Sequence, residues 1–383
     1  MMITQNKKIA IIGGGPGGLT LAKLLQLKNV QVHVYERDKH KDVRVQGATL
    51  DLHEESGLEA LRRAGLMDAF KANYRPDAGK LKILDKDLNQ YLNEHDSGSF
   101  HDEDRPEIDR APLRKILLET LEPETVIWDS QFFSMENQED GWILHFKNGK
   151  SYYADIVIAA DGANSKIRSY ITDVQAIYSG VTIIEGNIYN AQMNVPKLWE
   201  LVDGGKIFAM DEEKTLLFST KADGTLTFYT GCKVNETWAQ ESGIDFSNKE
   251  QIFEWFKKEY ETWNEIWQEL FETNDSSFVV RPQYHYPLDQ TWETLPNLTM
   301  LGDAAHRMPP YAGEGVNMAM QDAYELAECL TDGKSKDVQT ALSCYEKQMQ
   351  TRASEVTKIT LDNTVLMHGP QAIEKLMKMF SGE

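Results

Sequence analysis

The pattern of apolar and polar positions predicts a strand, a turn, a helix and a second strand at the start of the chain. Residues 8–12, KIAII, form a short apolar run rich in β-branched side chains, which is typical of a buried parallel strand. Residues 19–28 follow with leucines at helical spacing. Residues 30–35, VQVHVY, then alternate and end at Glu36. This order indicates a βαβ unit and a parallel sheet.

Farther along, the pattern predicts an antiparallel sheet and a helix that covers it. Residues 181–231 contain four strand-like runs joined by short turns such as Asp203-Gly204 and Asp223-Gly224. Short connections of this kind are typical of antiparallel strands. Residues 248–272 predict a helix with an aromatic stripe, which we interpret as the face that packs on the sheet. We therefore expect a mixed α/β fold in which a second lobe is inserted into the first.

Composition narrows the class of protein. The 383 residues are 41% hydrophobic and 26% charged, which is globular composition, and the formal charge is −20. A surface this negative disfavours nucleic acid and anionic lipid as partners. The apolar runs are far shorter than the ~20 residues that a bilayer span needs, so we expect no membrane association. The three cysteines, Cys232, Cys329 and Cys344, are widely spaced, which fits a reducing cytoplasm and excludes a disulfide framework.

The turn after the first strand has the composition of a phosphate-binding loop. Residues 13–18, GGGPGG, match G-x-G-x-x-G at Gly13, Gly15 and Gly18. In this motif the first glycine permits the tight turn, the second lets the backbone approach a pyrophosphate, and the third lets helix and strand pack closely. Glu36 closes the second strand, where a carboxylate accepts ribose hydroxyls. The unit predicts dinucleotide binding without separating NAD from FAD.

Two later motifs also place a carboxylate directly after an apolar strand. One strand leads into DGANSKIR at 161–168, and another into GDAAHRMPPYAGEGVN at 302–317. The carboxylates are Asp161 and Asp303. A helix extends from the second motif to Leu330.

Two other features stay open or receive a structural interpretation. Arg110 and Arg114 are four residues apart and share one helical face, so they form either a solvated basic pair or an arginine that reaches the cofactor. Spacing does not decide between these alternatives. His306 is interpreted as a structural partner, not as a catalytic acid or base.

The three motifs, in this order, resemble the fingerprints of class A, single-component FAD-dependent monooxygenases, the group of the aromatic hydroxylases. In detail the chain resembles the tetracycline-inactivating monooxygenases, over nearly its whole length, in stretches such as IIGGGPGGLTLAKLL, VYERD, GATLDLH, PEIDR and VIWD. The resemblance implies an aromatic-hydroxylase-like fold in four parts. These are a Rossmann-type FAD-binding domain (1–178), an antiparallel-sheet substrate domain (179–280), the GD-motif part of the FAD-binding domain (281–335) and C-terminal helices that bridge the lobes (336–383).

The resemblance also implies which residues hold the cofactors. Those matching FAD contacts are Gly13, Gly15, Gly18, Glu36, Arg37, Asp51, Arg110, Asp161, Asp303, Pro310, Gly313 and Gly315. Asp161 would also lie by the nicotinamide, and Arg44 matches a position assigned to NADPH. The helix after Gly315 would point at the N1–C2=O edge of the flavin, where its N-terminus offers about half a positive charge to the anionic reduced ring.

The positions that contact substrate in the tetracycline group differ here. They fall on Glu185, Lys206, Phe218 and Thr227 of the predicted sheet and on Tyr311. Only Phe218 is the family's residue; the others stand where the group has Gln, Arg, His and Phe. Lysine lacks the planar fork of arginine, so Lys206 is not a conservative replacement at a bidentate site. The positions that match cofactor contacts therefore agree with the family better than the positions that match substrate contacts. One alternative is that Glu185 and Lys206 pair with each other at the surface.

The resemblance implies a cytoplasmic, monomeric FAD monooxygenase that consumes NADPH and O2. It would hydroxylate an electron-rich phenol or enol through a flavin C4a-hydroperoxide, with a tetracycline as leading substrate and antibiotic resistance as the result. The alternatives are an aromatic-compound hydroxylase of secondary metabolism, another flavoenzyme of the same fold, and a redox-sensitive flavoprotein that only binds. No W-x-W-x-I-P segment of a halogenase is present, and no residues have metal-ligand spacing. We expect no side chain to act as acid or base.

Overall fold

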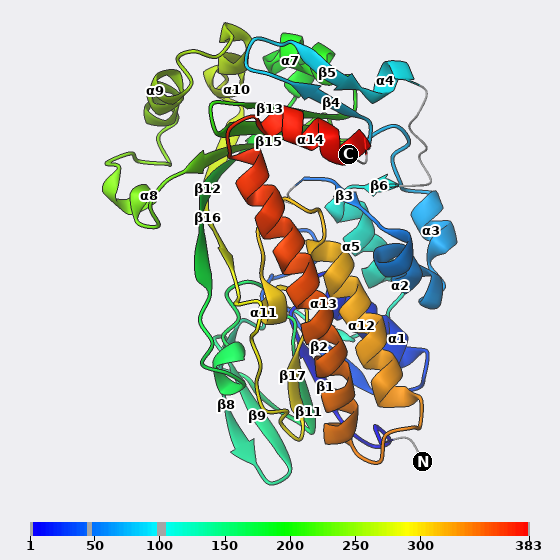
Figure 1. The fold of residues 1–383 in the computed structure, drawn as a ribbon. Coiled ribbons are helices and arrows are strands. Elements are labelled where there is room, and N and C mark those ends of the chain that lie inside the picture. The colour runs from blue at the N-terminus through cyan, green and yellow to red at the C-terminus, as the bar shows by residue number, and fades with distance from the viewer. Residues whose placement is uncertain (1–2, 44–47, 98–104, 382–383) are drawn as a thin grey trace.

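A five-stranded parallel sheet forms the base of the computed structural model, which describes residues 3–43, 48–97 and 105–381 (Figure 1). β1 lies in the middle and pairs with β11 and β2. All four residues of β1 and of β11 are buried, as expected of a parallel sheet covered on both faces. The spatial order is β17 (Leu298–Met300), β11 (Ile156–Ala159), β1 (Ile9–Ile12), β2 (Val32–Tyr35) and β7 (Val126–Ile127).

Helices and a small meander cover this sheet. The helix α1 (Pro16–Gln26) follows β1 directly and packs against α12 (Gly315–Thr331) and α5 (Arg110–Glu119). The meander consists of β8 (Phe132–Gln138), β9 (Gly141–Phe146) and β10 (Ser151–Ala154). It packs on the end of β2, where the rings of Tyr35 and Phe146 stack 4.9 Å apart. The predicted βαβ unit is therefore present.

A seven-stranded sheet forms the second part of the molecule. Its spatial order is β16 (Ser276–His285), β12 (Ile177–Ile188), β15 (Leu226–Lys233), β14 (Lys214–Thr220), β13 (Lys206–Asp211), β4 (Leu81–Leu84) and β5 (Gln90–Asn93). Neighbouring strands are antiparallel except β13 and β4, which are parallel. β4 and β5 come from the segment assigned above to the FAD-binding part, so residues from both sides of the predicted boundary at 178 build this sheet.

The predicted aromatic stripe packs on one face of the seven-stranded sheet. The segment forms α9 (Lys249–Glu259), a short 3₁₀ turn (Glu265–Gln268) and α10 (Glu269–Glu272). Phe256 and Trp267 are fully buried, and they join Phe218 and Phe228 of the sheet in one apolar cluster. The interpretation of the stripe as a packing face is confirmed.

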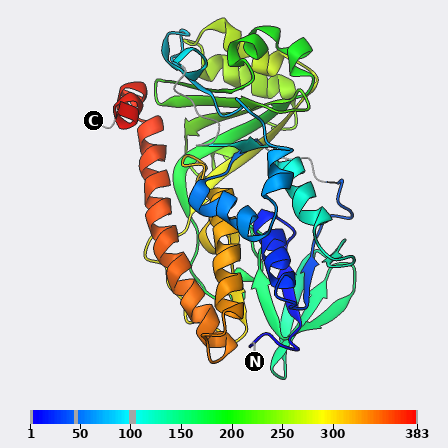
Figure 2. The same cartoon turned by 90° about the vertical axis from the view of Figure 1, so that its right-hand side faces the viewer.

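Two C-terminal helices contact both parts. The helix α13 (Val338–Met367) runs alongside the molecule from the five-stranded sheet to the seven-stranded one (Figure 2). It packs on α12, and α14 (Ala372–Ser381) then turns onto β13. Ile373 and Leu376 are buried against Ile83 and Met210 of the sheet. Farther along the same helix, Phe380 is 48% exposed.

Residues 50–71 form a series of short elements. Gly65, with φ of +71°, ends one helical turn, as a glycine in the left-handed region commonly does. The elements are β3 (Leu50–Asp51), a π turn (Glu54–Leu58), α2 (Glu59–Arg63) and α3 (Met67–Lys71).

The remaining elements are short. They are β6 (Glu107–Ile108), α4 (Glu94–Ser97), a 3₁₀ turn (Arg168–Tyr170), α6 (Ala191–Asn194), α7 (Pro196–Val202), α8 (Trp238–Glu241) and α11 (Asp303–His306). Over the three described ranges, the search for a helix with the length and apolarity of a bilayer span finds none.

Candidate active site

The glycine-rich loop between β1 and α1 is shaped by close backbone contacts. Gly13 has φ of +115°, and a Cβ there would lie 2.2 Å from the carbonyl oxygen of Ala160. A Cβ on Gly18 would lie 2.2 Å from the carbonyl oxygen of Gly13. A Cβ on Gly15 would meet nothing within 4 Å. The loop therefore packs tightly on one side and is open on the other, at the N-terminus of α1, as a pyrophosphate cradle requires.

Glu36 lies beside this loop at the end of β2. It is 2% exposed, its Oε2 accepts a hydrogen bond from the Gly14 N–H at 2.6 Å, and its Oε1 accepts one from the Asp38 N–H at 3.0 Å. A carboxylate has about four lone-pair sites, so it can still accept ribose hydroxyls. Arg37 follows it and is exposed, and Arg44 lies outside the described residues.

The structure separates the two arginines of α5. Arg114 is buried and braces the loop after β2, with bonds to Asp38 Oδ2 at 3.1 Å and to the Lys41 carbonyl at 2.9 Å. Arg110 lines a cavity instead, and its Nε donates to the Ala48 carbonyl at 3.2 Å. Of the two, Arg110 lines the cavity, and Arg114 lies against the glycine-rich loop, with its Nε 3.5 Å from the Gly14 carbonyl oxygen.

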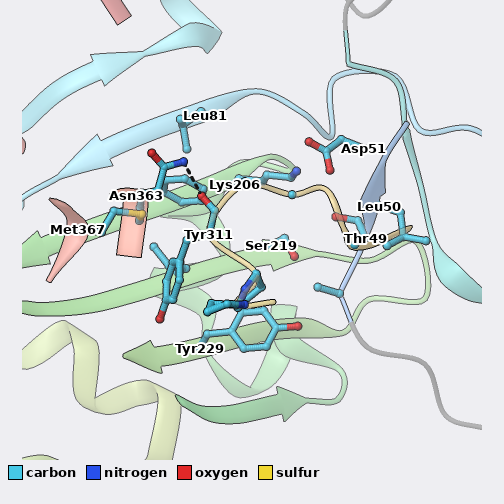
Figure 3. Close-up of a pocket in the computed structure, with 18 of the residues that line it drawn as sticks. Thr49, Leu50, Asp51, Leu81, Lys206, Ser219, Tyr229, Tyr311, Asn363 and Met367 are labelled. Atoms are coloured by element: carbon cyan, nitrogen blue, oxygen red, sulfur yellow. Dashed lines mark hydrogen bonds between the residues drawn. The ribbon is translucent and has the colours of Figure 1, made fainter. Parts of the chain in front are cut away.

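A cavity of about 460 Å³ lies between the seven-stranded sheet and the part built on the five-stranded sheet (Figure 3). It gathers residues from segments far apart in the sequence. The predicted site residues that line it are Asp51, Arg110, Lys206, Phe218, Asp303, Pro310, Tyr311, Gly313 and Gly315. Residues from α13 and α14, such as Met367 and Leu376, form part of the wall.

Two carboxylates follow the neighbouring strands β11 and β17, and one of them, Asp303, lines this cavity. The Asp303 side chain is surrounded by protein but open to the cavity, and burial raises its pKa. Burial also raises the pKa of Asp161, whose Oδ2 accepts from the Lys166 N–H at 2.9 Å. Asp161 Oδ1 is buried, and no described group donates to it. A buried acceptor left without a donor costs free energy, so both carboxylates fit a ligand rich in hydroxyl groups, as FAD is.

The turn that carries Asp303 is held by a buried carboxylate from α12. Asp322 is fully buried and accepts from the Gly302 N–H at 2.8 Å, from His306 Nε2 at 2.5 Å and from an Arg352 guanidinium nitrogen at 2.6 Å. His306 is itself 1% exposed and lies behind the cavity wall. The histidine is thus placed as a structural partner, in line with its interpretation from the sequence.

The N-terminus of α12 opens onto the cavity. Gly315 and Val316 line it, and a Cβ on Gly315 would meet nothing within 4 Å. Asn317 fixes this end of the helix, because its Nδ2 donates to the Asp51 carbonyl at 2.9 Å and its Oδ1 accepts from the His53 N–H at 3.0 Å. The helix therefore directs its first N–H groups toward the space expected for a flavin edge.

An ion-pair network not predicted from the sequence lies beside β3. His53 is 3.5 Å from Asp51 and 3.2 Å from Glu314, and these bonds raise its pKa to about 10. Burial alone would raise the pKa of Asp51, but the His53 bond and the Lys206 charge lower it to about 2. Glu314 lies within the recognised GD segment; nothing in the sequence marked His53 as its partner.

Lys206 and Glu185 do not pair with each other. The Lys206 ammonium is bonded to Glu107 of β6, and Glu185 accepts from Arg281 Nε at 2.5 Å. The alternative of a Glu185–Lys206 surface pair is wrong. Glu107 is 1% exposed and lies 99 residues from Lys206, so local sequence patterns gave no signal for this contact.

The alternation of side chains along the strands shows which of the predicted substrate residues direct their side chains toward the cavity. Ser219 pairs with both Lys206 and Thr227, so these three share the cavity-side face, and Phe218 points the other way. The Phe218 ring packs edge-on against Trp267 at 5.6 Å. Its neighbour Leu217, with Phe208 and Tyr229, is on the cavity-side face instead.

Two other predicted substrate residues lie on the cavity-side face of the sheet but beyond the cavity lining, since Thr227 pairs with Ser219 and Glu185 with Tyr229. Thr227 is fully buried and donates to Asn187 Oδ1 at 2.8 Å. Glu185 is 7% exposed and held by Arg281. Neither is among the described residues that line the cavity, whereas Lys206 and Tyr311 are.

Comparison with known proteins gives a family and a fold. The profile of a family described as the FAD binding domain matches residues 6–360. The chain is 29% identical to monooxygenase penA of Penicillium thymicola, over 98% of this chain and 99% of that protein. It is 28% identical to 6-hydroxynicotinate 3-monooxygenase of Pseudomonas fluorescens, over 95% and 93%.

Solved structures agree with the fold. The tetracycline destructase Tet(55) superposes with a TM-score of 0.77 at 20% identity, covering 100% of this chain and 95% of that one. Klebsiella pneumoniae HpxO complexed with FAD and uric acid superposes with a TM-score of 0.76 at 20% identity, over 99% and 94%. At this identity the likeness establishes the aromatic-hydroxylase fold alone.

Proposed function

The chain belongs to the FAD binding domain family and is an FAD-dependent monooxygenase, and on that premise we propose that it hydroxylates an electron-rich phenol or enol with NADPH as reductant. The observation that carries the proposal is that one cavity of about 460 Å³ is shared by both sets of residues. Residues expected around the flavin, such as Asp303 and Gly315, and residues expected around the substrate, such as Lys206, face the same space.

Different described residues would bind different parts of FAD. The loop at 13–18 and the N-terminus of α1 would hold the pyrophosphate, Glu36 the ribose, and Asp303 the ribityl chain. Bound FAD supplies the transfer of electrons from a reduced nicotinamide and the activation of O2. The N-terminus of α12 would stabilise negative charge at the flavin edge.

The substrate wall favours a flat, apolar molecule with one acidic group. Phe208, Leu217, Met367 and Leu376 supply apolar surface, and Lys206 supplies a positive charge at one end of it. Together they exclude water from the reacting atoms and orient the ring. A fused-ring phenol or enol has this combination of properties, which is why a tetracycline stays the leading candidate.

A second candidate is a hydroxylase of smaller aromatic compounds without tetracycline activity. The curated relatives favour it, because one is named for 6-hydroxynicotinate and another for 3-amino-4-hydroxybenzoate. A tetracycline destructase appears among the structural neighbours, where identity is too low to carry a substrate.

The test is a substrate panel with the FAD-loaded protein. Tetracycline, 6-hydroxynicotinate and 3-amino-4-hydroxybenzoate would be assayed for NADPH loss, with NADH in parallel, and for a product heavier by one oxygen atom. A compound that accelerates NADPH loss and gains oxygen supports the proposal. NADPH oxidation that no phenol or enol stimulates would overturn the substrate class, and equal rates with NADH would overturn the preferred reductant.

A further inference from the structure

A buried carboxylate, Glu107, lies directly behind the lysine on the substrate wall. Glu107 belongs to β6 and pairs with Asp51 of β3 across the two-stranded ladder. It is 1% exposed, and its Oε1 accepts a hydrogen bond from the Lys206 ammonium. Of these two partners, Lys206 lines the cavity and Glu107 does not. The lysine therefore separates a hidden carboxylate from the substrate space.

The surroundings of Glu107 make it a better proton acceptor than an exposed carboxylate. Its Oε2 is buried, and no described group donates to it with hydrogen-bonding geometry. Burial raises the pKa of Glu107, Lys206 lowers it, and the nearby Asp51 charge raises it again. The Thr49 side chain also lowers that pKa, by less than the other named groups. Among the described residues, Lys206 is the charged group that donates to this buried carboxylate, which therefore takes up a proton more readily than an exposed one.

The positive charge of Lys206 is already balanced. The charged groups that act on it are Glu107 of β6, Asp51 of β3 and Arg105, which precedes β6 and pairs with Glu94. Asp51 in turn faces His53, which also bonds Glu314. Figure 3 shows the Lys206 amino group directed toward the Asp51 carboxylate. A substrate anion added here would leave excess negative charge in a poorly solvated place, unless a proton came with it.

We propose that Lys206 and Glu107 form a proton-coupled site for an acidic hydroxyl, in which Lys206 binds the substrate oxyanion and Glu107 keeps the proton. This inference rests on the proposed function in taking the substrate to be a phenol or enol. The Lys206 N–H bond breaks as an O–H bond forms on Glu107. The resulting amine takes the proton of the substrate O–H, whose electron pair stays on the substrate oxygen. No oxidant or reductant is consumed.

The consequence for the reaction is that a neutral phenol would be bound and presented as its electron-rich anion. Free phenols such as tyrosine have a pKa near 10, so at neutral pH few of them are ionised in solution. Lysine alone would select the scarce anion. The pair would accept the abundant neutral form, and it would discriminate against rings without an acidic hydroxyl.

The experiment measures, in one titration, how many protons are taken up on binding and whether the bound ligand is a phenol or a phenolate. The FAD-loaded protein is titrated with 4-nitrophenol, whose phenol and phenolate absorb at different wavelengths, in weak buffer with a pH-indicating dye. Below the pKa of free 4-nitrophenol, we expect binding to produce the phenolate band without proton exchange. Above that pKa, we expect the phenolate band to persist while about one proton is taken up per bound ligand. Neutral phenol in the bound state at either pH would overturn the proposal, and so would phenolate bound without proton uptake above that pKa.

Variants assign the proton to its acceptor. Glu107→Gln keeps the shape of the side chain, and it should abolish proton uptake while phenolate still binds to Lys206. Lys206→Met should lose phenolate binding. Glu259→Gln is the matched control, because Lys214–Glu259 is a lysine–carboxylate pair at the other end of the same β13–β14 hairpin, 3.5 Å apart. Its proton count should equal that of the parent. Proton uptake that survives in Glu107→Gln would contradict the assignment.

The two proposals fail in different ways. If Glu107→Gln does not fold, the spectra and proton counts of the parent protein still decide the question. If a phenol is oxygenated but binds without the proton uptake, only the proton-coupled site is refuted. If neither 4-nitrophenol nor any panel compound binds or stimulates NADPH loss, the substrate class itself is refuted, and the proton-coupled site with it.

Discussion

Tyr311 Oη and His368 Nε2 lie 3.3 Å apart. This contact joins the cavity wall to the C-terminal end of α13, just before Gly369-Pro370. His368 Nδ1 bonds the Thr364 carbonyl at 2.9 Å, so Nδ1 carries the proton. Nε2 then accepts from the Tyr311 hydroxyl, with the Thr215 hydroxyl also 3.3 Å away. The histidine is fully buried, and burial lowers its pKa to about 4. It is therefore neutral at physiological pH.

His368 should make the protein acid-labile. Its pKa in the folded state, about 4, is below the ordinary 6.5, so its contribution to stability is complete above pH 6.5 and is lost as the pH falls toward 4. The loss amounts to about 3 kcal/mol of unfolding free energy. Urea unfolding at several pH values should show a flatter acid dependence for His368→Gln than for the parent. His145→Gln, at a half-exposed position on β9, is the control and should keep the parent slope.

Substitution of Gly15 and of Gly18 in the phosphate loop should have different effects. Gly15→Ala places a Cβ where nothing lies within 4 Å, so the protein without cofactor should melt normally and yet bind FAD poorly. Gly18→Ala would bring a Cβ within 2.2 Å of a backbone oxygen, so the apoprotein itself should be destabilised. Melting of both apoproteins, followed by FAD titration of each, separates the two effects. Normal FAD affinity in Gly15→Ala would show that the open side of the loop does not face the pyrophosphate.

Glu36→Gln should weaken FAD binding by about ten- to a hundredfold, because hydrogen bonds to a charged group are worth ~1.5–3 kcal/mol. Glu36 also accepts two backbone N–H groups, so the melting temperature of the apoprotein must be measured beside the FAD affinity. The matched variant is Asp38→Asn, since Asp38 braces the same loop through Arg114. Equal losses of FAD affinity in the two variants would mean that Glu36 only supports the loop.

Asp322→Asn should destabilise the protein by about 3–5 kcal/mol, because it removes one charge from a fully buried network. FAD affinity should also fall, since Asp322 holds the Gly302–Asp303 turn through the Gly302 N–H. Glu325→Gln is a control, because Glu325 binds the same Arg352 guanidinium at 2.6 Å but, within the described residues, has no hydrogen bond to that turn. It should cost less stability and leave FAD affinity unchanged. An Asp322→Asn protein with parental FAD affinity would separate the network from the cofactor site.

Local chemistry explains which features could be predicted. The loop at 13–18, Glu36 and the GD segment are recognisable because the residues that make each turn are neighbours in the chain. The face of β14 was not predictable, since Leu216, Leu217 and Phe218 are all apolar and a strand with two buried faces shows no alternation. Phe218 was therefore expected to direct its ring at the substrate, whereas its ring packs on Trp267 and the neighbouring Leu217 lies on the cavity-side face.

The features that could not be predicted depend on contacts between segments far apart in the sequence. Glu107 and Lys206 meet only because β6 and β13 come together in the folded chain. Arg110 and Arg114 have equivalent spacing, and only the fold shows that one lines the cavity and the other braces a loop. β4 pairs in parallel with β13, which lies far along the chain, so no local pattern could indicate this partner.

That parallel pair has a consequence for how the chain is made. β4 leaves the ribosome about 125 residues before the strand it pairs with, so its inner edge has no partner until much of the protein has been synthesised. Unpaired strand edges are templates for aggregation, and β4 is fully buried in the finished molecule. A nascent chain stalled or truncated before β13 would expose that edge. An exchange of substrate lobes between relatives would have to carry residues 81–93 together with 177–285, because transplanting the later segment alone would pair a new β13 with a foreign neighbour.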